Sequence, residues 1–205
     1  MSIQTLISWM KEPILTPPGC AHISWGSIVC SALHPLLKLI SDGHGIVDYL
    51  PLIVDHLFPL LDTIGHTWPR EYSVSAVNTL GQAAASAGPS FILYLSRAMG
   101  CLETVINVTK EDDSLSRRAA LAAMINILLS LGEAQFMPYF PVVVKTIIVG
   151  LSSTCEQLRT LCYEQLVTVS EYASSQVDIH LPDLVPLHFK SVCRKELSDM
   201  FEGGY

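Results

Sequence analysis

The stretch YLSRAMGCLETVINVTKEDDSLSRRAALAAMINILLSLG, residues 94–132, decides the fold. Its apolar residues predict two helices, about 95–108 and about 115–131, around the polar turn TKEDDS at residues 109–114. Asp113 or Ser114 is a good N-cap for the second helix, because a side-chain oxygen there accepts a hydrogen bond from an otherwise unpaired backbone N–H. Gly132 supplies the left-handed conformation that ends many helices. The stretch therefore predicts one antiparallel helix pair.

The same unit recurs along the chain. Its start is marked by a bulky pair of residues and an opening helix, at Tyr49-Leu50-Pro51, Tyr94-Leu95-Ser96, Tyr139-Phe140-Pro141 and His180-Leu181-Pro182. The third residues of these markers, at 51, 96, 141 and 182, are separated by 45, 45 and 41 residues. Proline suits the first helical position, where its missing N–H costs nothing, and Gly88 precedes Gly132 by 44 residues, in phase with the markers. Repeats of roughly 40–47 residues are typical of HEAT and armadillo proteins. We expect an all-α fold, an α-solenoid of about four to five HEAT-type antiparallel helix pairs.

The whole chain is expected to form one solenoid domain. A degraded first unit covers residues 1–45, the regular units cover 46–88, 89–132 and 133–175, and residues 176–205 form a C-terminal half unit or cap. The regular helices outside the deciding stretch are predicted at about 51–64, 69–87, 141–151 and 155–173, and the irregular ones at about 2–10, 23–41 and 182–201.

Two local features oppose helix formation inside these predicted helices. Pro59 lies within the helix at about 51–64, and an internal proline kinks or splits a helix. Val142-Val143-Val144 is β-branched but occupies a helical position of the repeat, where tertiary packing can override a local preference for strand.

The amino-acid composition argues against two classes of binding partner, nucleic acid and membrane. The net charge is -7 and the few Lys and Arg residues are scattered, whereas a general nucleic-acid binder usually has a basic face. Residues 13–37 and 72–96 contain no charged residue, but Pro17-Pro18-Gly19 and Gly88-Pro89 would leave backbone groups unpaired in lipid. We expect no nucleic acid, no membrane span, and a cytoplasmic or nuclear location, since no signal peptide is apparent.

Catalytic and metal-binding patterns are weak. The six cysteines contain no C-x-x-C pair, Gly43-His44-Gly45 lacks the lysine of a phosphate loop, and no H-E-x-x-H motif occurs. His180 and His188, with Asp183 between them, are the one pair considered for a metal. A linear array of helix pairs seldom brings catalytic groups together. We expect no enzyme, cofactor or metal; a helical enzyme or lipid carrier is a further alternative.

A binding face is expected on the second helices, which line the concave side of such solenoids. Polar residues share one face of the helix at 69–87, and the repeat offset aligns them into two columns, Asn78–Ala122–Glu164 and Gln82–Asn126–Thr168. The candidate partner-binding residues are Asn78, Gln82, Asn126, Glu164 and Thr168. They could line a groove for an extended or helical segment of a partner, or form an ordinary solvated face. The opposite faces, predicted to pack inward, carry Val74, Val77, Leu80, Leu121, Ile125, Leu128, Leu158, Cys162 and Val169.

Two segments carry a family resemblance. Residues 136–141 (FMPYFP) and 113–121 (DSLSRRAAL) are similar to repeats of the importin-β-like nuclear transport receptors. The resemblance implies a protein-binding scaffold whose partners are cargo or a Ran-like GTPase. It also implies inter-repeat contacts from Asp113 and Arg117, and from Arg159 in the next unit, although Cys155 stands where the acidic partner of Arg159 would be. Such receptors are several times longer, so the resemblance implies a fragment or reduced copy. The alternative is a HEAT scaffold or regulatory subunit of another complex, of phosphatase or assembly type.

Overall fold

The computed structural model describes residues 46–62, 70–108, 114–173, 178–180 and 182–186, with side chains described from residue 74 in the second of these ranges. The helices predicted at about 2–10 and 23–41 lie outside these residues. Of the helix predicted at about 182–201, only residues 182–186 are described, and they are helical.

Every regular element in the described part of the chain is a helix, so the predicted all-α class is confirmed. The chain divides into two compact units, Met1–Phe136 and Met137–Tyr205, and each is described by itself. The described elements of the first unit are η1 (Val47–Tyr49), α3 (Leu50–Asp62), α4 (Arg70–Ala87), η2 (Gly88–Tyr94), α5 (Leu95–Val108), α6 (Ser114–Leu131) and α7 (Glu133–Phe136). Those of the second unit are η3 (Met137–Tyr139), α8 (Phe140–Leu151), α9 (Glu156–Tyr172) and η4 (Asp178–His180).

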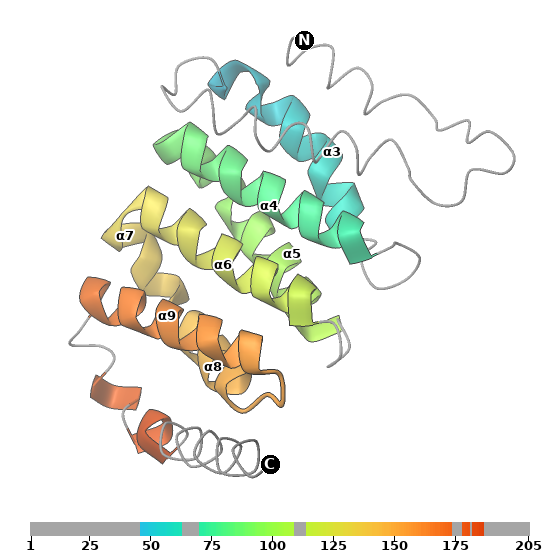
Figure 1. Cartoon of the computed structure of the whole chain (residues 1–205). Coiled ribbons are helices and arrows are strands. Elements are labelled where there is room, and N and C mark those ends of the chain that lie inside the picture. The colour runs from blue at the N-terminus through green and yellow to red at the C-terminus, as the bar shows by residue number, and fades with distance from the viewer. Residues whose placement is uncertain (1–45, 63–69, 109–113, 174–177, 181, 187–205) are drawn as a thin grey trace, which may run out of the picture. The chain divides into compact units, whose positions relative to one another are not determined.

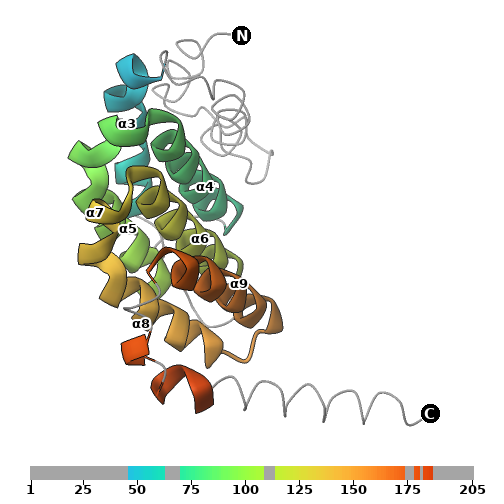
Figure 2. The same cartoon turned by 90° about the vertical axis from the view of Figure 1, so that its left-hand side faces the viewer.

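The first unit contains two helix pairs, and equivalent helices of the two pairs pack against each other. Within the pairs, α3 packs against α4 and α5 packs against α6. Between the pairs, α3 contacts α5 and α4 contacts α6. Figures 1 and 2 show the result as two layers, with α3 and α5 in one and α4 and α6 in the other. The α4–α6 layer carries the first two residues of each predicted polar column.

The second unit contains one further pair. α8 packs against α9, and η3 packs against the start of α8. His180, at the end of η4, lies against Phe140 at the start of α8, with ring centroids 6.0 Å apart. The β-branched run Val142-Val143-Val144 lies inside α8, as the repeat predicted, and two of its three side chains are fully buried.

The glycines that end the predicted helices have the required geometry. Gly88 follows α4 with φ 53° and Gly132 follows α6 with φ 90°. Both values fall in the left-handed region, which glycine adopts without the steric cost of a Cβ atom. The sequence-based assignment of these two helix ends is confirmed.

The prolines also take the places expected of them. Pro51 is the second residue of α3 and Pro141 the second residue of α8, positions whose N–H groups have no partner within the helix. Pro59 lies inside α3, which the structure describes as continuous from Leu50 to Asp62.

The connection between α4 and α5 was not predicted as regular structure. It is a 3-10 helix of seven residues, η2, held by the fully buried ring of Phe91. η2 packs against α4, α5 and α6, so the link between the two pairs is part of the core of the first unit. Its tip faces solvent, where Leu93 is 85% exposed.

The residues predicted to face inward belong to the core, with one partial exception. Val77 and Leu80 on α4 are fully buried, and Val74 is half-buried. The other predicted residues are buried in their own units: Leu121, Ile125, Leu128, Leu158, Cys162 and Val169.

By length and composition alone, two segments of the described chain could cross a membrane, Ser114–Leu131 and Glu133–Leu151. The first is α6, of which 44% is buried and which packs against α4, α5, η2 and α7. The second is interrupted by η3, which contains Pro138. The central helix of a globular core satisfies the same length and composition, so the expected absence of a membrane span stays a prediction.

Candidate functional site

A hollow of about 280 Å³ lies in the α4–α6 layer of the first unit. Three amide side chains line it: Asn78 and Gln82 from α4, and Asn126 from α6. Small residues complete the lining, namely Gly81, Ala85, Ala122 and Ala123. Three of the five residues predicted to contact a partner are therefore brought together in space.

The repeat period explains why these side chains meet. Because α4 packs against α6, positions roughly one repeat apart lie next to one another, which brings Asn78 and Gln82 to the same hollow as Ala122 and Asn126. The two helices approach closely at Gly81, where an added Cβ atom would lie 3.2 Å from the Cβ atom of Ala123. A larger residue at this crossing would separate the helices and deform the hollow.

The three amides differ in their hydrogen bonding. The Gln82 Nε2 atom donates to Ser86 Oγ, one turn further along α4, at 3.3 Å. Asn78 and Asn126 are exposed, and neither amide has a hydrogen bond within the described residues. Each amide offers two N–H donors and a carbonyl acceptor. The rim of the hollow therefore carries both hydrogen-bond donors and hydrogen-bond acceptors, and no charged group lines the hollow.

The other two predicted residues lie on α9 of the second unit. Glu164 is exposed, and the Thr168 hydroxyl donates to the Glu164 backbone carbonyl at 3.1 Å. Their spacing of one helical turn places them on one face of α9. The alignment of this face with Asn126 on α6 stays a prediction.

The predicted inter-repeat residues have mixed outcomes. Asp113 lies outside the described residues, so its link to Arg117, which lies half-buried in the first turn of α6, stays a prediction. The Arg159 Nη1 atom donates to the carbonyls of Ser153 and Thr154 at 2.9 and 2.8 Å. These bonds close the turn between α8 and α9, so they fasten Arg159 within its own helix pair. A link from Arg159 to a neighbouring pair stays a prediction.

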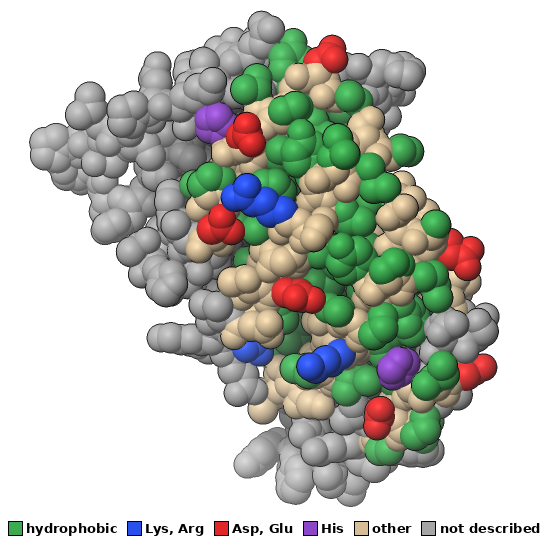
Figure 3. All heavy atoms as spheres, turned by 180° about the vertical axis from the view of Figure 1, so that it is seen from behind, with side chains coloured by type: hydrophobic (Ala, Val, Ile, Leu, Met, Phe, Trp, Pro, Cys, Tyr) green, Lys and Arg blue, Asp and Glu red, His purple; other side chains and the backbone are tan. Residues whose placement is uncertain are grey.

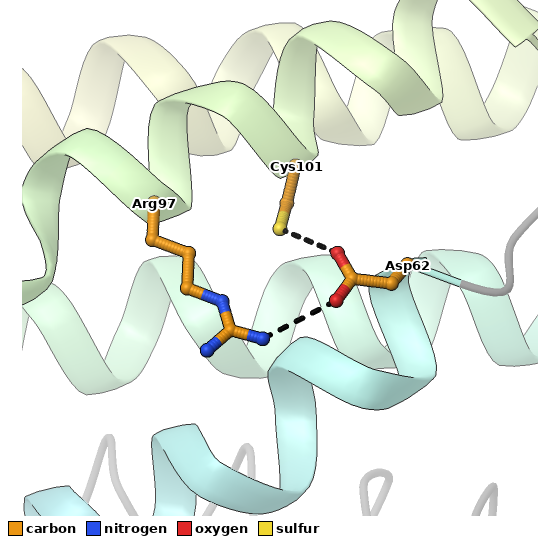
Figure 4. A network of polar contacts seen from close by, with 3 residues as sticks. All are labelled: Asp62, Arg97 and Cys101. Carbon is orange, nitrogen blue, oxygen red and sulfur yellow. Dashed lines mark hydrogen bonds and ion pairs between the residues drawn. The ribbon is translucent and has the colours of Figure 1, made fainter.

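A contact between helix pairs that the sequence did not suggest joins α3 to α5 (Figure 4). The Arg97 guanidinium bonds one carboxylate oxygen of Asp62 at 3.3 Å, and the Cys101 thiol donates to the other at 3.3 Å. Arg97 also lies over the Phe58 ring, with its guanidinium carbon 4.7 Å from the ring centroid. Asp62 and Arg97 are more than half exposed, so their ion pair contributes about 0–1 kcal/mol to stability. The contact joins the two helix pairs of the first unit.

Two buried thiols are held in the protonated form. Burial, reinforced by the hydrogen bond to Asp62 and its negative charge, raises the pKa of Cys101 to about 12. Burial alone raises the pKa of Cys162 to about 12. In the folded chain both thiols stay protonated at pH values above 9.0, the ordinary pKa of a thiol. The contribution of the two protonated thiols to the free energy of unfolding is therefore complete below about pH 9 and is lost as the pH rises from 9 towards 12.

We predict that Cys101 and Cys162 do not react with iodoacetamide in the folded chain at pH 7.5. A pKa three units above the ordinary value lowers the thiolate fraction roughly 1000-fold, and burial also excludes the reagent. Cys155, which is half-buried at the start of α9, should be alkylated first among these three. Peptide mapping by mass spectrometry measures each site, with the chain in guanidinium as the control, where all three should react alike. Labelling of Cys101 at the rate of Cys155 in the folded chain would contradict the assignment.

Charged and metal-binding groups are sparse in the described residues. They contain no group of three or more His, Cys, Asp or Glu side chains that could hold a metal ion. Figure 3, seen from the side opposite to Figure 1, shows Lys and Arg side chains scattered among hydrophobic and polar ones. His188, half of the histidine pair considered for a metal, lies outside the described residues.

No protein-family model, curated protein or solved structure matches the sequence. Functional inference therefore depends on the helix packing and on the α4–α6 hollow.

Proposed function

We propose that the chain is a HEAT-type α-solenoid and acts as a protein-binding scaffold. Two observations support the solenoid. The first helices α3 and α5 pack against each other, as do the second helices α4 and α6, and the sequence markers that open three successive pairs are 45 residues apart. The α8–α9 pair has the same organisation of a first helix that begins at a repeat marker and a longer second helix. Proteins of this architecture bind partners along the surface formed by successive second helices.

The observation that carries the binding function is the α4–α6 hollow. It lies between second helices of successive pairs, and its polar rim is formed by Asn78, Gln82 and Asn126. Asn78 and Asn126 are exposed, come from two different helices and have no hydrogen bond within the described residues, which is more typical of recognition than of core packing.

The partner class we favour follows from the resemblance of residues 113–121 and 136–141 to importin-β-like receptors. On this proposal the chain contributes to nuclear transport, in the cytoplasm or nucleus, by binding cargo or a Ran-like GTPase. The alternative is a HEAT scaffold or regulatory subunit of another complex. Binding to a Phe-Gly repeat protein separates the two, because transport receptors bind such repeats and scaffolds of phosphatase or assembly type are not expected to do so.

We predict that Asn126→Arg lowers the recovery of specific partners about tenfold in affinity purification from cell extract. The arginine adds a charge and a long side chain to a small, uncharged hollow, and tenfold corresponds to about 1.4 kcal/mol of lost binding energy. Combination with Glu164→Arg should lower the recovery further if α9 belongs to the same binding face. Quantitative mass spectrometry of the purified complexes measures both.

The matched control is Ser96→Arg, which places the same charge at an exposed position of α5, in the other helix layer. All variants should keep the thermal midpoint of the unsubstituted chain within a few degrees, since the substituted residues are exposed. If partner recovery with Asn126→Arg equals that with Ser96→Arg, the hollow is not the binding surface.

A further inference from the structure

We propose that the α4–α6 hollow binds an extended, uncharged segment of a partner protein by hydrogen bonds to the main chain of that segment. This inference rests on the proposed protein-binding function and specifies the chemistry of the partner. It depends on the kind of side chain at the rim, the size of the residues at the floor, and the spacing of the amides.

The rim matches a peptide main chain better than it matches a helix. Each residue of an extended segment exposes one N–H and one C=O, and a side-chain amide offers the complementary acceptor and donors. A helix has already paired these groups internally and docks by an apolar face into a groove lined with apolar side chains. The lining of the hollow contains no apolar residue larger than alanine.

The spacing of the amides suits an extended chain that follows α4. Asn78 and Gln82 are four residues apart, which places them about 6 Å apart along the helix axis at a rise of ~1.5 Å per residue. Two residues of an extended chain span about 6.6 Å, so alternate residues of the segment present equivalent main-chain groups at almost the same interval. Asn126 approaches the hollow from α6 and can bond the segment from its other edge.

The floor restricts the side chains of the segment. Gly81 and Ala123 are buried and in close contact at the floor, and Ala85 and Ala122 complete the lining with methyl side chains. A volume of about 280 Å³ would be shared by the main chain and side chains of the two or three residues that enter the hollow, which favours Gly, Ala or Ser at the residues that face inward. Because the lining is uncharged, Lys, Arg, Asp and Glu would lose their hydration there without gaining a partner.

A library of linear heptapeptides displayed on phage, selected against the full chain, tests the inference. Selected peptides are resynthesised in two N-methylated forms, one methylated at the odd and one at the even peptide bonds, and their affinities are measured by fluorescence polarisation. We expect small, uncharged residues at alternate positions. The form methylated on the edge that faces Asn78 and Gln82 should bind at least about tenfold more weakly, and the form methylated on the edge that faces Asn126 should lose less affinity, because one amide instead of two bonds that edge. Peptides that become helical on binding, as seen by circular dichroism, or that keep full affinity in both N-methylated forms would overturn the inference.

Variants of the chain separate this inference from the proposed function. Ala85→Leu fills the hollow from an exposed position of α4, and Ala134→Leu adds the same side chain at an exposed position of α7 outside the hollow. Loss of peptide binding with Ala85→Leu, but not with Ala134→Leu, supports the hollow as the binding site. If Ala85→Leu blocks binding while both N-methylated forms still bind, the hollow recognises side chains: the proposed function stands and the main-chain inference fails. If no selected peptide is sensitive to Ala85→Leu or Asn126→Arg, both fail.

Discussion

Replacing Phe91 with alanine is expected to lower the free energy of unfolding of the chain by about 3–5 kcal/mol, a typical cost for deleting a buried phenylalanine ring. The Phe91 ring is fully buried and is the only buried side chain of η2. It lies against the Tyr94 ring, with centroids 6.0 Å apart, and anchors a segment that packs against α4, α5 and α6. Its loss should therefore loosen the packing of both helix pairs of the first unit. Urea unfolding followed by circular dichroism measures the change.

Leu93→Ala is the matched control, two residues away in the same 3-10 segment. Leu93 is 85% exposed, so its truncation should change the free energy of unfolding by less than about 0.5 kcal/mol. Equal effects of Phe91→Ala and Leu93→Ala would mean that η2 is not anchored by its buried ring.

Replacing Gly150 with valine is expected to lower the free energy of unfolding by about 3 kcal/mol, at the upper end of the usual range for overpacking a core. Gly150 is buried near the end of α8, where an added Cβ atom would overlap the sulfur of Cys162 on α9. Cys162 is fully buried, so its side chain has little room to move aside. The two helices can pack at this distance because one of them has no side chain at the contact.

Two glycine-to-alanine substitutions, one at Gly100 and one at Gly150, separate the steric effect of an added Cβ atom from its effect on helix propensity. Alanine favours helix over glycine by up to about 1 kcal/mol, so Gly100→Ala in α5, with open space around its Cβ position, should stabilise the chain. Gly150→Ala should instead destabilise it by about 1–2 kcal/mol, because overpacking exceeds the gain in helix propensity.

Cys162→Ala removes the overlapping sulfur and should reduce the penalty of Gly150→Ala by at least about 1 kcal/mol in a double-mutant cycle. Differential scanning calorimetry of the four chains measures this coupling. A penalty unchanged by Cys162→Ala would mean that the sulfur is not the obstacle.

The helices could be predicted closely from the sequence because local signals and the repeat agree. The helix predicted at about 95–108 is α5, Leu95–Val108, and the one predicted at about 115–131 is α6, Ser114–Leu131. Glycine C-caps and proline starts act through the backbone of one or two residues, so they can be recognised without knowledge of the packing. The spacing of the repeat markers also predicts which helices of the first unit pack together, since equivalent helices of successive repeats become neighbours.

The Asp62–Arg97–Cys101 contact could not be predicted in this way. Arg97 and Cys101 lie 35 and 39 residues from Asp62, and neither distance equals the repeat period. The contact depends on the angle and offset between α3 and α5, which side-chain packing sets. The 3-10 helix η2 could not be predicted from the sequence either, because only the burial of Phe91 distinguishes this segment from an ordinary loop.

The candidate site was predictable in part for the same reasons. The 44-residue offset predicted that Asn78, Gln82 and Asn126 share one face, and the structure places all three around one hollow. The hollow itself depends on Gly81, whose close approach to Ala123 the polar pattern could not indicate. Glycine at a helix crossing has no signature distinct from glycine at an exposed helical position such as Gly100 until the neighbouring helix is in place.

Asp62 is poorly suited to its own helix. It is the last residue of α3, where the helix dipole is negative and an acidic side chain costs about 0.3–1 kcal/mol. The neighbouring pair compensates, through Arg97 and Cys101 on α5. The α3–α4 pair, if it were transferred to another protein, would therefore carry a destabilising carboxylate unless the helix packed against α3 also supplied an arginine at the place of Arg97. In this contact the α3–α4 and α5–α6 pairs complement one another, so we expect them to be more stable together than when exchanged separately.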